Sequence, residues 1–104
     1  MAKMALNQHS LIAAYMMTNK PNGTLYTGVT SALIHRVYQL RNGLLAGFTK
    51  RYGCKTLVWY EIHELMAAAI QREKNIKAYP RRWKLNLINA MNPEWQDLWP
   101  QIAS

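Results

Sequence analysis

Two tyrosines, one on each arm of a predicted β-hairpin, carry the first chemistry that this chain suggests. Tyr15 and Tyr26 lie in short apolar runs on either side of Pro21-Asn22-Gly23, and Asn-Gly between such runs is the strongest local hairpin signal. A two-residue turn at this Asn-Gly pair would place Tyr15 opposite Thr30. Because side chains alternate along a strand, both phenols would then project from one face. They form either the floor of a site or part of the core, since tyrosine is a good strand former.

Two charged residues lie where apolar side chains are expected. Arg36 falls within the apolar stripe of a helix that begins near residue 31, and Glu73 within that of a helix over residues 64–78. Charged side chains are almost never buried without a partner, because desolvating one costs several kcal/mol. Either Arg36 and Glu73 therefore pair as a buried salt bridge, or both open into a cleft with the two tyrosines.

The second alternative has a definite chemistry. A carboxylate suits Mg²⁺ or Mn²⁺, which usually keeps several waters and is completed by substrate phosphate. A guanidinium forks onto phosphate oxygens. A phenol can orient or deprotonate an attacking water. Together these groups suit metal-assisted hydrolysis of a phosphodiester bond.

The elements that must position these residues follow the order strand, strand, helix, strand, helix, helix. Strands are predicted over about 12–18, 24–29 and 56–62, an ordered loop over 47–53, a third helix over about 80–91 and a final turn over 94–98 that docks Trp95 and Trp99. Residues 1–11 are predicted to form a loose leader and residues 12–104 a single domain. The predicted inward stripes are Leu33, Val37, Leu40 and Leu44, then Leu65, Ala69 and Ile76, then Trp83, Leu87 and Met91.

Composition narrows the class of partner. The 104 residues contain 13 Lys and Arg against 5 Asp and Glu, so the net charge is +8. This excess predicts a polyanionic partner, nucleic acid first and an acidic membrane surface second. Cys54 is the single cysteine, which excludes a disulfide framework and fits a reducing compartment. No apolar run approaches the roughly 18 residues needed to cross a bilayer, so a cytoplasmic protein is expected.

The four chemical residues also occur in a familiar order and spacing. Ala13-Ala14-Tyr15, Tyr26-Thr27-Gly28, Arg36 and Glu73 resemble the GIY-YIG nuclease superfamily, and most closely its small stand-alone bacterial members. The stretches 22–30, 47–53, 72–74 and 91–95 are also similar to that group. The resemblance implies an α/β (α+β) fold with a three-stranded antiparallel sheet, flanking helices and a one-metal nuclease site.

Roles for individual residues come from this resemblance. It implies that Glu73 holds the divalent ion, Mg²⁺ or Mn²⁺, and that Arg36 binds and neutralises the scissile phosphate. Tyr15 would act as general base or water-orienting group, with Tyr26 as a supporting phenol and Gly28 beside them. A phenol with a pKa near 10 is a poor base at neutral pH, so the role of base needs help from the metal or Arg36.

The chain also departs from the family pattern. Ala13-Ala14 replaces Gly-Ile, and Leu40 stands where many relatives place a histidine that assists at the site. His35 is a weak substitute because it faces about 100° away from Arg36. Asn92 either touches the site or turns the chain before Pro93. The loss of the histidine leaves two alternatives to an active endonuclease: a nucleic-acid-binding module without turnover, or a protein-interaction domain with an architectural Arg36–Glu73 pair.

Basic residues in three segments are predicted to contact nucleic acid, DNA rather than RNA, through its phosphates. Each one taken alone is equally a solvated surface residue. Aromatic residues near these charges either stack on bases or belong to the core. The basic candidates are Lys50, Arg51, Lys55, Arg72, Lys74, Lys77, Arg81, Arg82 and Lys84; the aromatic ones are Trp59, Tyr60, Tyr79 and Trp83.

Overall fold

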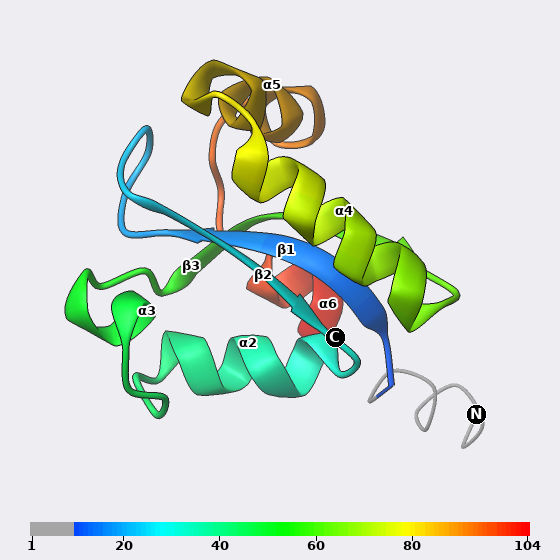
Figure 1. Cartoon of the computed structure of the whole chain (residues 1–104). Coiled ribbons are helices and arrows are strands. Elements are labelled where there is room, and N and C mark those ends of the chain that lie inside the picture. The colour runs from blue at the N-terminus through cyan, green and yellow to red at the C-terminus, as the bar shows by residue number, and fades with distance from the viewer. Residues whose placement is uncertain (1–9) are drawn as a thin grey trace.

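A three-stranded antiparallel sheet forms the centre of the protein, as predicted. The computed structural model describes residues 10–104, so the predicted leader lies almost wholly outside the described residues. The strands are β1 (Ile12–Thr18), β2 (Leu25–Thr30) and β3 (Thr56–His63), in the order β2-β1-β3 (Figure 1). Three longer helices follow in the predicted order: α2 (Leu33–Arg41), α4 (Met66–Ala78) and α5 (Arg81–Met91). There are also two short helices. Helix α3 (Phe48–Arg51) lies where an ordered loop was predicted, and α6 (Trp99–Ala103) begins directly after the turn predicted at 94–98.

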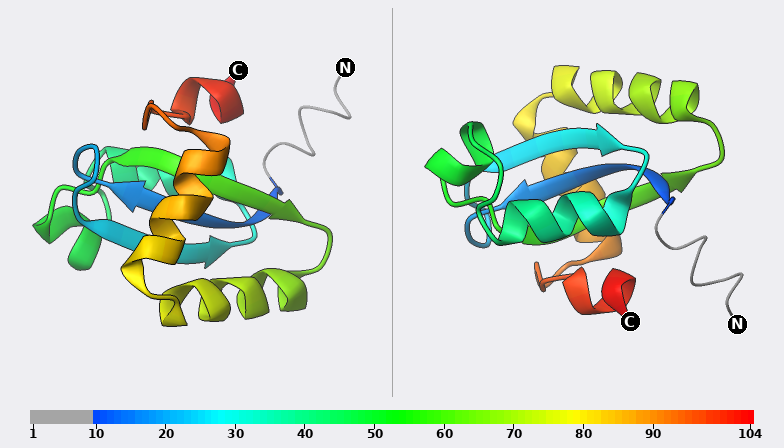
Figure 2. Two further views of the ribbon diagram at one scale, coloured as in Figure 1. Left: turned by 90° about the horizontal axis from the view of Figure 1, so that it is seen from above. Right: turned by 90° about the horizontal axis from the view of Figure 1, so that it is seen from below.

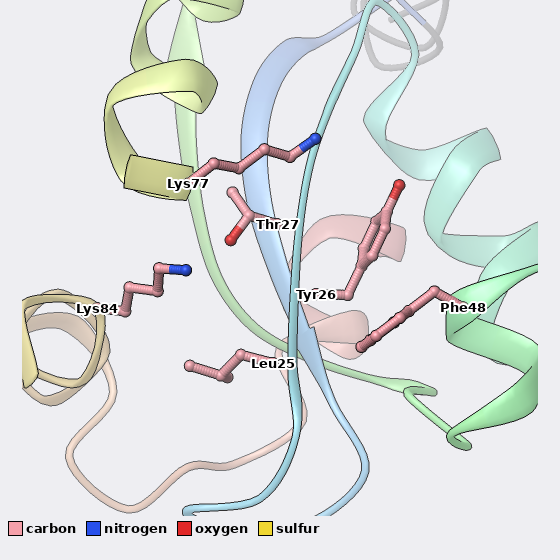
Figure 3. Close-up of a pocket in the computed structure, with 6 residues that line it drawn as sticks. All are labelled: Leu25, Tyr26, Thr27, Phe48, Lys77 and Lys84. Atoms are coloured by element: carbon pink, nitrogen blue, oxygen red, sulfur yellow. The ribbon is translucent and has the colours of Figure 1, made fainter. Parts of the chain in front are cut away.

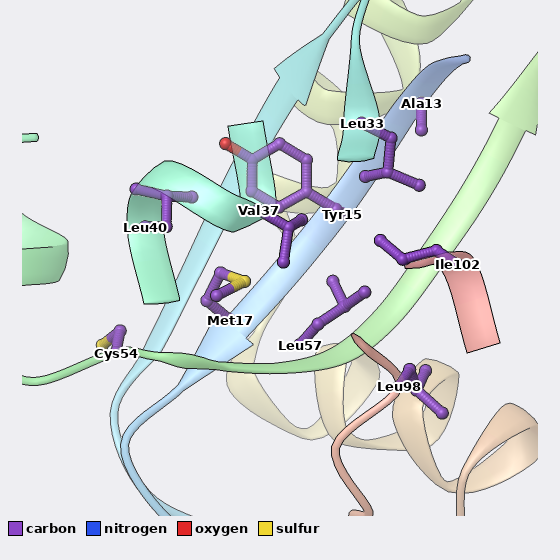
Figure 4. Packing of buried hydrophobic residues seen from close by; sticks show 10 residues of the cluster. All are labelled: Ala13, Tyr15, Met17, Leu33, Val37, Leu40, Cys54, Leu57, Leu98 and Ile102. Atoms are coloured by element: carbon purple, nitrogen blue, oxygen red, sulfur yellow. The ribbon is translucent and has the colours of Figure 1, made fainter. Parts of the chain in front are cut away.

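Both faces of the sheet are covered, which explains why β1 is buried along almost its whole length. Helices α2 and α6 lie on one face, whereas α4 and α5 lie on the other (Figures 1 and 2). On the α2 face, Tyr15 and Met17 pack against Val37 and Leu40 (Figure 4). On the α4 face, β1 packs against Ile76 and Ile88. Within residues 10–104, no helix is sufficiently long and apolar to span a bilayer.

The hairpin has a different register from the one predicted. Tyr15 pairs with Gly28 and not with Thr30, and the loop runs over residues 19–24. The tight turn lies inside this loop, where the Gly23 N–H donates to the Lys20 carbonyl (2.9 Å) and Asn22 has a φ of 57°. A type II turn requires a positive φ at its third residue and favours proline at its second, and Asn22 and Pro21 occupy these two positions. The register moves by two residues, so the predicted common face of the tyrosines is preserved.

The inward stripes were predicted only in part: on α2, Leu33, Val37 and Leu40 are buried as predicted, but Leu44 is not. Leu44 and Leu65 lie beyond the helix ends and are exposed. On α5, Trp83 and Met91 are exposed and Ile88 is buried in their place. The α5 stripe was wrong because the helix contacts the sheet mainly through one turn, which periodicity alone does not reveal.

Asn92 holds the C-terminal segment against β3. A register shift between Met16 and Met17 makes an irregularity in the pairing of β3 with β1. The Asn92 Nδ2 group donates to the Val58 carbonyl (3.2 Å) in this region and to the Gln96 carbonyl (2.8 Å), and its Oδ1 accepts from the Gln96 N–H (3.0 Å). The buried amide therefore performs the chain-turning role that was one of its two predicted alternatives.

Replacing Asn92 by alanine is expected to lower the free energy of unfolding by about 2–3 kcal/mol, because a buried carbonyl loses its donor. Urea unfolding followed by circular dichroism measures this loss. Asn75→Ala on the exposed side of α4 is the matched control and should change stability by less than about 0.5 kcal/mol. Equal losses in the two variants would contradict the role given to Asn92.

Candidate active site

The two tyrosines lie side by side on the α2 face of the sheet. Tyr15 is fully buried and Tyr26 half-buried, with their ring centroids 6.3 Å apart. In the observed register, Met17 faces Tyr26, and Tyr15 lies two residues before Met17 on the same strand. Their predicted common face is thus confirmed.

Gly28 makes the position of the Tyr15 ring possible. These residues are direct partners across β1 and β2, and a Cβ atom on Gly28 would lie 2.5 Å from both Cζ and the hydroxyl oxygen of Tyr15. Such a separation is far inside van der Waals contact. The ring therefore occupies the space that any other side chain at residue 28 would fill. Tyr15 can take this position only because residue 28 is glycine.

The Tyr15 hydroxyl is the unusual polar atom of this core. It is buried and has no hydrogen-bond partner within residues 10–104. Burial and the neighbouring Tyr26 raise the pKa of Tyr15 to about 12, although the nearby Arg36 acts in the opposite direction. Arg36, half-buried on α2, forms no ion pair with an acid of the described residues. A buried polar atom without a partner, beside a free guanidinium, is a place for a water or a ligand oxygen.

Glu73 lies on the other side of the sheet from the two tyrosines. It lies on α4, its side chain is 13% exposed, and its Oε2 atom is 2.9 Å from Nζ of Lys77 one turn later. Because Lys77 is its ion-pair partner, the predicted alternative of a buried Arg36–Glu73 salt bridge is wrong. The carboxylate is shielded but not sealed, since Lys77 itself is more than half exposed.

An open cavity of about 270 Å³ joins the two sides around the edge strand β2. Tyr26 and Phe48 lie on one side of β2, and Lys77 and Lys84 on the other (Figure 3). Tyr26 thus shares one hollow with the lysine that holds Glu73. The structure brings Tyr15, Tyr26 and Arg36 together directly, and it connects Glu73 with Tyr26 through Lys77, which lines the same cavity as Tyr26.

The residues present fit a single hard cation. No group of three or more His, Cys, Asp or Glu side chains gathers within residues 10–104, so a cage built from protein ligands alone is not formed there. Mg²⁺ is commonly bound by one or two carboxylates with waters and substrate phosphate. An i,i+4 ion pair such as Lys77–Glu73 contributes only about 0.3–0.5 kcal/mol, so a cation can displace the ammonium at little cost.

Some of the basic residues predicted to contact nucleic acid already bind other parts of the protein, whereas others are exposed to solvent. Arg72 is engaged by Glu61 (Nε–Oε1 2.9 Å) and by the Tyr79 hydroxyl (3.2 Å). Arg81 donates to the carbonyls of Asn22 and Gly23, which ties α5 to the hairpin loop. Lys84 is half-buried in the cavity. Among the other candidates, the exposed ones are Lys50, Arg51, Lys55, Lys74, Lys77 and Arg82.

The remaining candidates lie near the site or outside it. His35 is exposed on α2, and Leu40 is buried in the core beside Val37 (Figure 4). Sequence reasoning missed Phe48, which lines the cavity, and the pairing of Lys77 with Glu73. Phe48 was treated as part of a loop. The i,i+4 spacing of Lys77 from Glu73 could have indicated that pair.

Comparison with known proteins agrees with this geometry. The GIY-YIG catalytic domain family model matches residues 12–86, which is well over half of the chain, so the protein belongs to the GIY-YIG family of nucleases. It is similar to a UPF0213 protein of Staphylococcus aureus strain Mu3, with 39% identity over 67 residues, 64% of this chain and 82% of that protein. A UPF0213 protein of Staphylococcus saprophyticus is 35% identical over 68 residues, 65% of this chain and 83% of the relative. No solved structure matches.

Replacing Gly28 by alanine is expected to lower the free energy of unfolding by about 1–3 kcal/mol, because the new methyl group overlaps the Tyr15 ring. The test is a double-mutant cycle by urea unfolding. In a Tyr15→Ala background the same methyl group has room, and the penalty should largely disappear. An equal penalty in both backgrounds would mean that the glycine is needed for another reason.

Tyr15→Phe is expected to be at least as stable as the wild type at pH 7, because it removes a buried hydroxyl without a partner. The pKa of Tyr15 rises from about 10 in the unfolded chain to about 12 in the fold. The protonated phenol therefore contributes stability in full below about pH 10, and loses up to about 2–3 kcal/mol of it as the pH rises through 12. Urea unfolding between pH 7 and pH 12 should show this loss in the wild type and less of it in Tyr15→Phe.

Burial also raises the pKa of the Cys54 thiol, but Cys54 is present in both proteins, so their difference isolates Tyr15. Parallel pH profiles of the two proteins would contradict a buried, protonated Tyr15.

Proposed function

We propose that this protein is a divalent-metal-dependent endonuclease that hydrolyses phosphodiester bonds in DNA. The observation that supports it most is the buried Tyr15 hydroxyl, which has no partner among the described residues and lies beside the guanidinium of Arg36. A core without a function would be at least as stable with phenylalanine at this position. The membership in a nuclease family supports the reaction class.

Glu73 is the residue proposed to hold the ion, Mg²⁺ or Mn²⁺. When bound, such an ion stabilises the charge that develops on the phosphate and lowers the pKa of a coordinated water. Lys77 would leave Glu73 in that state, and its long, exposed side chain then becomes available to a phosphate of the substrate.

Arg36 is proposed to bind the phosphate under attack. Its guanidinium has no carboxylate partner among the described residues, so it can donate to two non-bridging oxygens and neutralise their charge. This contact also orients the phosphate relative to the Tyr15 hydroxyl, and orientation of this kind accounts for a large part of the rate of such reactions.

Tyr15 is proposed to hold and orient the attacking water. With a pKa of about 12, only about one phenol in 10⁵ is ionised at pH 7. The hydroxyl therefore accepts a hydrogen bond from the water and keeps its own proton. A role as general base would require the pKa to fall when the phosphate and the cation are bound, with Arg36 already acting in that direction. Tyr26 supports the phenol from the open side.

The substrate is proposed to be DNA, cleaved at a nick or another structural feature, in the cytoplasm. The +8 net charge supports a polyanion, and the exposed lysines and arginines would hold it without reading its sequence. A nucleic-acid-binding module without turnover is the second candidate. It is favoured by Leu40, because a buried leucine occupies the position at which relatives place a histidine.

Glu73→Gln and Glu73→Ala are expected to reduce the metal-dependent nicking of supercoiled plasmid by at least about 100-fold, because the ion loses its protein ligand. Both variants should keep the wild-type circular dichroism spectrum, since the ion-pair partner of Glu73 among the described residues is a lysine that is more than half exposed. Glu64→Gln, an exposed carboxylate just before α4, is the matched control and should nick at the wild-type rate.

Three outcomes of this experiment have different consequences. Normal nicking by Glu73→Ala would remove Glu73 from the mechanism. Salt-dependent DNA binding without nicking by the wild type would favour the binding module. No binding of DNA at all would favour the protein-interaction domain.

A further inference from the structure

The short helix α3 and the residue directly after it carry two aromatic side chains, Phe48 and Tyr52, that the proposed mechanism does not use. The helix begins after Gly47, whose φ of 114° is a conformation that favours glycine. Phe48 and Tyr52 are four residues apart and therefore lie on the same side of the helical turn, with ring centroids 4.6 Å apart. Thr49 is turned towards the interior and buried.

Nearly half of each of these two side chains is exposed to solvent. Phe48 is 45% exposed and Tyr52 is 46% exposed, whereas burial of a large aromatic side chain normally stabilises a small domain substantially. Single exposed apolar residues are common, but these two touch each other. Phe48 also lies 6.0 Å from the Tyr26 ring, which is itself next to Tyr15. A row of four rings therefore leads from solvent to the buried phenol.

The cavity beside this row has two walls of different chemistry. Tyr26 and Phe48 form an aromatic wall on one side of β2, and Lys77 and Lys84 supply ammonium groups on the other (Figure 3). The lining contains no Asp or Glu, and Arg51 adds a positive charge 5.6 Å from the centre of the Tyr52 ring. A flat apolar surface opposite fixed positive charge complements a nucleotide, which carries a planar base and an anionic phosphate.

We propose that Phe48 and Tyr52 form a stacking site for one unpaired nucleobase of a DNA strand, whose phosphates lie along Lys77 and Lys84. This inference rests on DNA as the substrate in the proposed function and adds the part of the strand that is recognised. The cavity of about 270 Å³ is slightly smaller than pockets that enclose a whole small-molecule ligand. Its size and openness therefore suit one nucleotide of a longer chain.

The base must be unpaired for a geometric reason. Within a duplex, both faces of every base are covered by the neighbouring base pairs, so a side chain can stack only on a base that has left the helix. The substrate class that follows is single-stranded, gapped or frayed DNA. Stacking of this kind tolerates any base, because every base offers a π-face.

The four aromatic residues for which stacking was one of two predicted alternatives do not form this site. Trp59 is buried, Tyr60 is half-buried and donates to Gln101, and Tyr79 accepts from Arg72. Trp83 is exposed, but it packs edge-on against Tyr79 outside the cavity. None of these four lines the hollow that contains Tyr26.

The test is fluorescence anisotropy in the presence of EDTA, so that binding is measured without cleavage. The probes are a short labelled oligothymidylate and the same oligomer with abasic sites at its central positions, which keeps the phosphates and removes the bases. The wild type is expected to bind the intact oligomer roughly 5- to 100-fold more tightly than the abasic one. In Phe48→Leu, which keeps apolar contact with Tyr26, this ratio should fall to about one.

Two further variants make the result specific. Tyr52→Leu should reduce the ratio in the same direction, which guards against a folding defect peculiar to Phe48→Leu. Tyr38→Leu removes an equally exposed ring that packs on Trp99 and does not line the cavity, and it should keep the wild-type ratio. Melting curves verify that all variants are folded.

The outcomes separate this inference from the endonuclease proposal. An unchanged ratio in Phe48→Leu, binding of duplex as tight as binding of the single strand, or no binding of either oligomer would overturn the stacking site. Plasmid nicking by the wild type together with an unchanged ratio removes the stacking site and leaves the endonuclease. A ratio that depends on Phe48, without nicking by the wild type, supports the stacking site and rejects the endonuclease.

Discussion

The contact of the Tyr15 ring with Gly28 is the packing constraint on which the site depends. The ring lies directly over a backbone position that has no side chain, and this brings β1 and β2 into a register that also places Tyr26 beside Tyr15. The same contact buries the hydroxyl under α2, next to Arg36 and without a partner in the described part of the chain. A buried hydroxyl of this kind costs stability, a trade-off that is common in active sites, and this supports the role proposed for Tyr15.

The position of β2 at the edge of the sheet allows residues from both faces of the sheet to line one cavity. The Tyr26 ring and Lys77, the ion-pair partner of Glu73, lie on opposite sides of β2 (Figure 3), and they can line one cavity because β2 has no neighbouring strand on its outer edge. Edge strands expose unpaired backbone groups and are usually protected. Here α4 lies along one side of β2, and Phe48 of α3 packs on Tyr26 at the other. The elements that protect the edge thus also form the walls of the hollow.

Local patterns in the sequence predicted the elements better than their mutual contacts. The strands, the order of the long helices and three of the four residues of the α2 stripe were predicted correctly, because alternation and helical periodicity record which face is buried. The hairpin register was predicted wrongly because the loop is longer than two residues. The Thr24 N–H donates to the Asn19 side chain across this loop, and the Asn-Gly pair does not predict that hydrogen bond. Among the basic residues, Arg72 is occupied by Glu61 eleven positions earlier, and only the path of the chain determines that pairing.

The sequence by itself determined the chemical groups, their order and the face from which the two phenols project, since residue type and period-two alternation need no knowledge of the rest of the fold. It could not determine which partner each charged side chain takes, or that side chains from both sides of β2 line one cavity. Those features were decided by tertiary structure, because the Arg72–Glu61 pair, the unpartnered Tyr15 hydroxyl in the described part of the chain and the Tyr26–Phe48 contact depend on distances between segments that only packing brings together.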